Sequence, residues 1–272
     1  MVFELRDFSV HHDSVGSSAA SRALVDVNLA ITQGEQIALV GPSGAGKTSL
    51  LHTMACAHKA ESGKLDIFGQ DPWTLGHAQR HTLRSRLFLA PQTPPLPPRQ
   101  RVVTTVLAGR LPQWSFRQAI TSLIKPSDPD AAYDALERFN IQDKLYERVD
   151  RLSGGERQRC GLARLLISQA EVLLVDEPLS ALDPTLALQT LTTLQQETTR
   201  RNATLICSLH QIDLALSHFP RIVGLRDGRI VFDAPRAEVT EEMIEELYRN
   251  ARQSEAGGHA AIHADTHLEP QF

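Results

Sequence analysis

The sequence has few cysteines, no excess of positive charge and no long apolar run, and each shortage excludes a class of protein. Its 272 residues include three scattered cysteines, whose spacing fits neither a zinc site nor a disulfide framework, so we expect a reducing cytosol. Lysine and arginine number 28 against 32 acidic residues, which gives no field for binding nucleic acid. No apolar stretch approaches the roughly 18 residues of a membrane-spanning helix, and no signal peptide is recognisable. We therefore expect a chain that neither spans nor crosses a membrane.

A glycine-rich segment between an apolar stretch and a helical pattern predicts a site for a nucleotide triphosphate. Residues 36–40 have the pattern of a buried strand, residues 48–54 begin a helical pattern, and residues 41–48 match G-x-x-x-x-G-K-[ST]. Glycines let such a loop bring its N–H groups close to phosphate oxygens, and the helix N-terminus adds a positive dipole end. A chance glycine-rich turn is the alternative, but it does not explain the flanking strand and helix. The residues expected to bind the phosphates are Gly41, Pro42, Ser43, Gly44, Ala45, Gly46, Lys47, Thr48 and Ser49.

Within this segment, two side chains have expected chemical roles. Lys47 should reach the β- and γ-phosphates, and the Thr48 hydroxyl should ligate Mg²⁺.

A second apolar stretch ends in two acidic residues. Residues 172–175 form an uninterrupted apolar run after Glu171, as in a parallel strand buried on both faces, and Asp176 and Glu177 follow at its carboxyl end. Asp176 is expected to hold Mg²⁺, and Glu177 is placed to act as general base toward an attacking water. The alternative is an ordinary acidic strand end, which the nearby lysine loop makes the weaker interpretation.

A second glycine segment precedes that strand. Ser153 and Glu156 have the spacing of a capping box, and residues 157–168 continue as a helical pattern. An ordinary N-cap does not need Gly154 and Gly155 in its first turn, where each costs roughly 1 kcal/mol relative to alanine. Exposed amides that must lie against an anion would justify that cost. Because the lysine loop already serves the phosphates, we expect this turn to contact a nucleotide held by another copy of the chain.

Together these motifs resemble the ATP-binding cassette (ABC) family. Residues 152–156 are similar to the family's signature motif, with Glu156 where glutamine is commoner; Gln92 matches the Q-loop, residues 180–183 the D-loop, and His210 the switch histidine. The resemblance covers about residues 2–250 and implies ATP and Mg²⁺ as cofactors. It implies catalytic roles for Lys47, Glu177 and His210, nucleotide contacts from Gln92, Ser153, Gly154, Gly155 and Asp183, and metal contacts from Thr48, Gln92 and Asp176.

One position departs from the family pattern. The family usually places an aromatic residue near the end of the first strand to stack on adenine, and this sequence offers His12 there, with Phe8 as the nearest aromatic ring. His12 is therefore the expected stacking residue. The residues that follow, 13–22, are small and polar, which predicts an exposed hairpin loop.

The resemblance also implies the fold. We expect an α/β protein with a P-loop NTPase core, which is a mixed, largely parallel sheet with flanking helices, joined by an antiparallel β subdomain and an inserted helical subdomain at about residues 93–165. This nucleotide-binding domain should span residues 1–250, with Asp183 and Pro184 as N-cap and first residue of a helix. Residues 251–272, with histidines at every fourth position, are expected to form a disordered tail.

Further segments resemble the ATPase subunits of phosphonate-type importers: residues 106–111, 114–117, 135–139, 143–148 and 209–216. The implied function is to power uptake of a small solute, phosphonate or a related phosphorus oxyanion, at the cytoplasmic side of the inner membrane. The implied partners are a second copy in a nucleotide-sandwich homodimer, transmembrane permease subunits and a periplasmic or extracellular solute-binding protein, with no nucleic acid. The alternatives are a soluble ATPase of a carbon–phosphorus lyase complex, a transporter ATPase for another solute, and a mechanical ATPase acting on DNA or ribosomes. The last usually needs coiled-coil insertions or a tandem cassette, and the sequence has neither.

Overall fold

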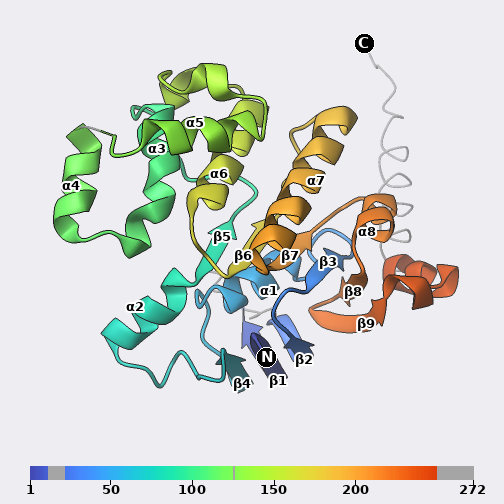
Figure 1. Ribbon diagram of the computed structural model, residues 1–272. Helices are drawn as coiled ribbons and strands as arrows, with labels where there is room; N and C mark the ends of the chain where they lie inside the picture. The colour runs from blue at the N-terminus through green and yellow to red at the C-terminus, as the bar shows by residue number, and fades with distance from the viewer. Residues whose placement is uncertain (12–21, 125, 250–272) are drawn as a thin grey trace, which may run out of the picture.

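Two sheets organise the computed structural model, which describes residues 1–11, 22–124 and 126–249 (Figure 1). The larger has the strand order β5-β6-β7-β3-β8-β9, in which the first five strands run parallel and β9 pairs antiparallel with β8. The smaller is antiparallel, with the order β2-β1-β4. The strands are β1 (Phe3–His11), β2 (Arg22–Ile31), β3 (Gln36–Val40), β4 (Ser62–Ile67), β5 (Leu87–Ala90), β6 (Val172–Asp176), β7 (Thr204–Ser208), β8 (Arg221–Arg226) and β9 (Arg229–Pro235).

Helices cover the large sheet and extend from it on one side. Helix α6 packs against α3 and α5, and this helical group is the inserted subdomain (Figure 1). The expected fold class is confirmed: the sheet is mixed and largely parallel, and the antiparallel sheet and the helical insert are separate layers. The helices are α1 (Lys47–Met54), α2 (His77–Ser85), α3 (Val102–Leu107), α4 (Phe116–Ile124), α5 (Pro129–Glu137), α6 (Gly154–Ile167), α7 (Pro184–Arg201) and α8 (Ile212–His218), the 3₁₀ turns η1 (Ala108–Gln113), η2 (Gln142–Lys144), η3 (Val149–Arg151) and η4 (Arg236–Glu238), and a last helix over 241–249.

The central strands are buried on both faces because their alternate side chains enter two different cores. In β6, Leu173 and Val175 join the core shared with the helical insert, whereas Val172 and Leu174 join the core beneath the antiparallel sheet. Strand side chains alternate between faces, so a strand between two cores must be apolar throughout. This explains the uninterrupted apolar run in the sequence.

Helix boundaries follow local signals. Asp183 caps α7 by accepting hydrogen bonds from the backbone N–H groups of Thr185 and Leu186, Pro184 is the first helical residue, and Asn202 ends the helix in the left-handed conformation. The predicted start of this helix is therefore confirmed.

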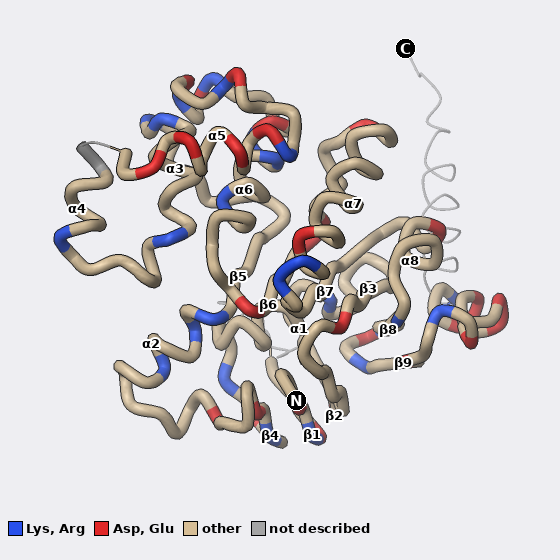
Figure 2. The backbone as a smooth tube through the Cα atoms, viewed as in Figure 1, with Lys and Arg blue, Asp and Glu red and all other residues tan. Residues whose placement is uncertain are grey.

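Charge of both signs is spread over the described residues, with Lys and Arg next to Asp and Glu in the helical insert and around α7 (Figure 2). In the part of the chain that the structure describes, we find no helix with the combined length and apolarity needed to cross a membrane. The predictions for His12, for most of the 13–22 loop and for the 251–272 tail lie outside the described residues.

Candidate active site

The carboxyl ends of neighbouring parallel strands form one edge of the large sheet, and the predicted site residues collect there. Strand β3 leads into the glycine loop, β6 ends at Asp176, β7 ends at Ser208, and β5 is followed by Gln92. Ligand sites of open α/β sheets lie beyond these strand ends.

Two glycines of the loop occupy positions that other residues could not take. Gly41 has φ +147°, and a Cβ there would lie 2.0 Å from the carbonyl oxygen of Leu225. Gly46, at φ +102°, would bring a Cβ within 2.8 Å of the oxygen of Ala23. Around Gly44, by contrast, no atom lies within 4 Å of an added Cβ. The loop backbone is thus fixed against the protein at two points and open to a ligand between them.

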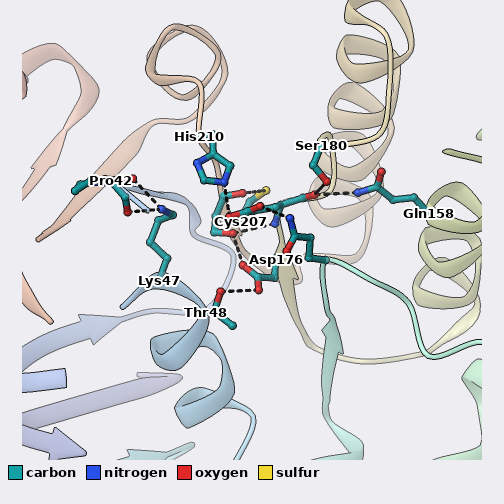
Figure 3. A network of polar contacts seen from close by, with 12 residues as sticks. Pro42, Lys47, Thr48, Gln158, Asp176, Ser180, Cys207 and His210 are labelled. Atoms are coloured by element: carbon teal, nitrogen blue, oxygen red, sulfur yellow. Dashed lines mark hydrogen bonds and ion pairs between the residues drawn. The ribbon is translucent and has the colours of Figure 1, made fainter. Parts of the chain in front are cut away.

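Lys47 lies inside this loop. Its ammonium group donates hydrogen bonds to the carbonyl oxygens of Gly41, at 2.8 Å, and Pro42, at 3.1 Å (Figure 3). Burial lowers the pKa of this amine, and the negative charges of Glu177 and Asp176 oppose the shift. A buried cation beside loop amides is the arrangement that an incoming polyphosphate would complete.

Asp176, at the end of β6, is linked to helix α1 and to the end of β7. Its Oδ2 accepts a hydrogen bond from the Thr48 hydroxyl at 2.9 Å, and its Oδ1 accepts one from the Ser208 hydroxyl at 2.6 Å (Figure 3). Asp176 is 4% exposed and Ser208 is fully buried. Carboxylate and hydroxyl oxygens at this separation suit Mg²⁺, which prefers oxygen ligands and usually takes one or two from the protein. The residues present therefore fit the expected metal.

Sequence reasoning missed Ser208. Its hydroxyl fixes the Asp176 carboxylate and also accepts a hydrogen bond from the backbone N–H of Glu177 at 2.9 Å. Ser208 pairs in register with Asp176 across β6 and β7. The available signal was a polar residue at the end of an otherwise apolar strand.

Glu177 is held from two sides. One carboxylate oxygen accepts a hydrogen bond from Gln92 Nε2 at 2.7 Å, and the other lies 2.5 Å from His210 Nε2. The Glu177 side chain is 12% exposed, and its backbone has φ +48°, in the left-handed region that glycine favours. Gln92 and His210, which the sequence predicted as separate parts of the site, are thus both brought into direct contact with Glu177. The structure directs the Gln92 amide nitrogen at Glu177, and its role as a metal ligand stays a prediction.

The second glycine turn forms the predicted capping box. The Ser153 hydroxyl accepts from the Glu156 N–H at 3.2 Å, and the Glu156 carboxylate accepts from the Ser153 N–H at 2.8 Å, which lowers the pKa of Glu156. A Cβ on Gly154 would meet nothing within 4 Å, whereas one on Gly155 would lie 2.9 Å from the Ala181 oxygen. Gly155 is therefore also required by packing inside the chain, a reason that the sequence did not reveal.

Two predicted nucleotide contacts, those of Asp183 and His12, are not seen in the structure, for different reasons. Asp183 uses its carboxylate to cap α7, so its predicted contact with nucleotide stays a prediction. His12 lies outside the described residues. Phe8, the nearest aromatic ring, is fully buried in the core beneath the antiparallel sheet, where adenine could not reach it.

Comparison with known proteins agrees with this geometry. The family model described as "ABC transporter" matches residues 24–180. A "Phosphonates import ATP-binding protein PhnC 2" of Albidiferax ferrireducens is 55% identical over 248 residues, which cover 91% of this chain and 89% of that protein. A "Phosphonates import ATP-binding protein PhnC 1" of Pseudomonas aeruginosa is 51% identical over 247 residues, covering 89% and 92%.

Solved structures share the fold. The dimeric, post-hydrolysis structure of the ATP-binding cassette MJ0796, bound to ADP and Pi, superposes with a TM-score of 0.72 at 23% identity and covers 86% of this chain and 98% of that one. The structure of cbiO1 from Clostridium perfringens gives a TM-score of 0.70 at 22% identity, covering 96% and 98%. From the family model and from relatives above half identity over nine-tenths of its length, this chain belongs to the ABC transporter family, and it is an ATPase.

Proposed function

We propose that this chain is the ATP-hydrolysing subunit of an ABC importer that takes up phosphonates or related phosphorus oxyanions. The observation that carries the hydrolytic role is Glu177, whose carboxylate contacts both Gln92 and His210 at the strand edge. The substrate class rests on the relatives at 55% and 51% identity, which are phosphonates import proteins.

ATP would be held by the loop from Gly41 to Ser49. The open backbone near Gly44 offers N–H groups to the phosphate oxygens, and the Lys47 ammonium exchanges its two carbonyl partners for the β- and γ-phosphates. Mg²⁺, held by Thr48 and Asp176 with Gln92 as the further predicted ligand, would neutralise charge on the phosphates. His12 remains the proposed residue for stacking on adenine.

Glu177 would orient a water molecule for in-line attack on the γ-phosphorus and accept its proton. Gln92 and His210 each contact one of its two carboxylate oxygens and so restrict the side chain to one orientation. The general base is therefore already oriented before the reaction. His210 would contact the γ-phosphate, as the resemblance to the family's switch histidine implies, and its Nε2 lies beside the Glu177 carboxylate.

A second copy of the chain would complete the site. The Ser153, Gly154 and Gly155 turn, with Asp183, would face the nucleotide of the partner copy, and the same pairing in reverse makes a homodimer of C₂ symmetry. We further propose that permease subunits bind near Gln92, that a periplasmic or extracellular solute-binding protein delivers the cargo, and that the chain sits peripherally on the cytoplasmic side of the inner membrane.

The role of Glu177 is tested by Glu177→Gln. Loss of the general base should lower kcat by about 100-fold or more, while ATP affinity stays close to wild type. Glu137→Gln is the matched control, because it removes the same charge from an exposed position on α5. Ordinary hydrolysis by Glu177→Gln would refute the assignment.

Lys47→Ala should lose ATP affinity as well as turnover, since the charge of Lys47 contacts the phosphates before the reaction.

The importer role is tested in proteoliposomes that contain the chain, its permease and its binding protein. ATP hydrolysis should rise when the binding protein is loaded with a phosphonate, and should not rise with an amino acid or a sugar. Hydrolysis without dependence on permease or binding protein would favour a soluble complex instead.

A further inference from the structure

Gln158 connects two functional segments that the mechanism treats separately. It lies in α6, one turn after Gly154, and points toward the loop that follows β6, where Figure 3 shows it beside Ser180. Its Nε2 donates to the backbone carbonyl of Glu177 at 2.9 Å, and its Oε1 accepts from the backbone N–H of Ala181 at 3.2 Å. Gln158 is 4% exposed. A carbonyl can only accept and an N–H can only donate, so these two partners fix the orientation of the amide.

The backbone of Glu177 needs such support. A non-glycine residue at φ +48° is strained and persists only where its surroundings hold it. Its N–H is fixed by Ser208 of β7, and its carbonyl accepts from Gln158 and from the Ser180 hydroxyl, at 3.2 Å. Ser180 belongs to the same loop as Glu177. Gln158 is the support that comes from the helix carrying the second glycine turn.

Helix α6 and this loop touch at a second point. The Ala181 oxygen approaches Gly155 so closely that an added Cβ would lie 2.9 Å from it. Gln158 accepts a hydrogen bond from the N–H of the same Ala181. Helix α6 therefore contacts both the N–H and the carbonyl oxygen of this residue. A shift of the helix N-terminus therefore displaces the loop and the Glu177 carbonyl with it.

From these contacts we propose that Gln158 is a positioning residue that couples the two ATP sites of the dimer. In each chain it links the Ser153–Gly155 turn, which serves the nucleotide of the partner copy, to Glu177, which serves the chain's own nucleotide. Nucleotide binding at the turn sets the position of α6, and Gln158 passes that position to the general base across the buried amide. This inference rests on the proposed dimeric function.

The test compares two substitutions in the full-length chain assembled with its permease. Gln158→Met keeps the approximate volume and removes both hydrogen bonds. Gln158→Glu keeps an acceptor for the Ala181 N–H but, when ionised, cannot donate to the Glu177 carbonyl. Gln196→Met, at an exposed position on α7, is the control. Rates are measured against ATP concentration, binding of a fluorescent ATP analogue gives affinity, and thermal melting reports folding.

If Gln158 positions Glu177, both variants lower kcat by about 10- to 100-fold, as misplacement of a reacting group does. The Hill coefficient of the wild type can be at most about 2, because there are two coupled sites. In both variants it should fall toward 1. Affinity for the ATP analogue stays within about twofold, because the Lys47 loop is untouched.

Three results overturn the inference. They are a wild-type Hill coefficient of 1, wild-type kcat and cooperativity in folded Gln158→Met, and wild-type behaviour of Gln158→Glu at alkaline pH, where the ionised carboxylate keeps only the Ala181 contact. If Gln158→Met does not fold, Gln158→Glu decides alone. Failure of the proposed function looks different, since the wild type would then lack hydrolysis or Glu177→Gln would retain it.

Discussion

Ser208→Ala tests whether one buried hydroxyl stabilises both the metal-binding carboxylate and the backbone of the general base. The substitution removes a 2.6 Å hydrogen bond to Asp176 and leaves the Glu177 N–H without its acceptor. A hydrogen bond to a charged group is worth about 1.5–3 kcal/mol, and a buried N–H without a partner costs about 1–3 kcal/mol. Because alanine has no hydroxyl to desolvate, part of this loss is offset. We expect the free energy of unfolding to fall by about 3 kcal/mol.

The rate of hydrolysis should fall as well. Without Ser208, the Asp176 carboxylate can rotate away from Thr48, and the strained Glu177 backbone loses the hydrogen bond on its N–H side. We expect kcat to decrease about tenfold or more. The measurements are urea unfolding followed by circular dichroism and ATP hydrolysis at saturating Mg-ATP.

Ser122→Ala is the matched control for this prediction. Ser122 is buried and donates to the neutral carbonyl of Ala119 within its own helix, at 2.7 Å. Removing that bond should cost less than about 1 kcal/mol and leave kcat unchanged. If Ser208→Ala loses no more stability than Ser122→Ala and hydrolyses ATP at the wild-type rate, the reasoning about Ser208 is wrong.

Three further predictions follow from packing and charge. Gly161→Ala places a Cβ 2.7 Å from Pro94, so the loop after Gln92 must shift and the free energy of unfolding should drop by about 1–3 kcal/mol in urea; an unchanged midpoint would contradict this. The hydrogen bond from Arg200 lowers the pKa of Glu197, which is 3% exposed. Glu197→Gln should therefore cost about 1–3 kcal/mol near neutral pH. Burial raises the pKa of the Cys160 thiol to about 12, so its reaction with a disulfide reagent should be about 100-fold slower in native than in urea-unfolded protein.

The pH dependence of Glu197 has a definite sign. Its folded pKa is depressed below the ordinary value of 4.5, so the stabilisation is fully present above the unfolded pKa and is lost as the pH falls through the folded pKa. Unfolding curves of wild type and Glu197→Gln should therefore differ at pH 7 and converge in acid. A gap that persists at the lowest pH, where Glu197 is neutral, would assign the effect to packing instead of charge.

Local patterns in the sequence were sufficient for the elements that carry the predicted site residues, whereas the roles of those residues stay predictions. The glycine loop, the capping box at Ser153 and the Asp183–Pro184 helix start depend on residues a few positions apart, and the structure forms each as expected. Ser208 and Gln158 were missed for a common reason. Each acts on residues 19 to 32 positions away in the chain, and its local sequence does not indicate which residues it contacts.

By itself the sequence determined that a phosphate loop, two acidic residues and a second glycine turn exist, because backbone conformation, capping and burial are set by near neighbours. Only the tertiary structure decided how they meet. The strand order places β6 beside β7 and β7 beside β3, although β3 lies more than a hundred residues earlier in the chain. An apolar core on each face of the sheet holds these strands together. The strand order sets Thr48 and Ser208 within hydrogen-bonding distance of Asp176 and holds Glu177 in a conformation that its own sequence does not favour.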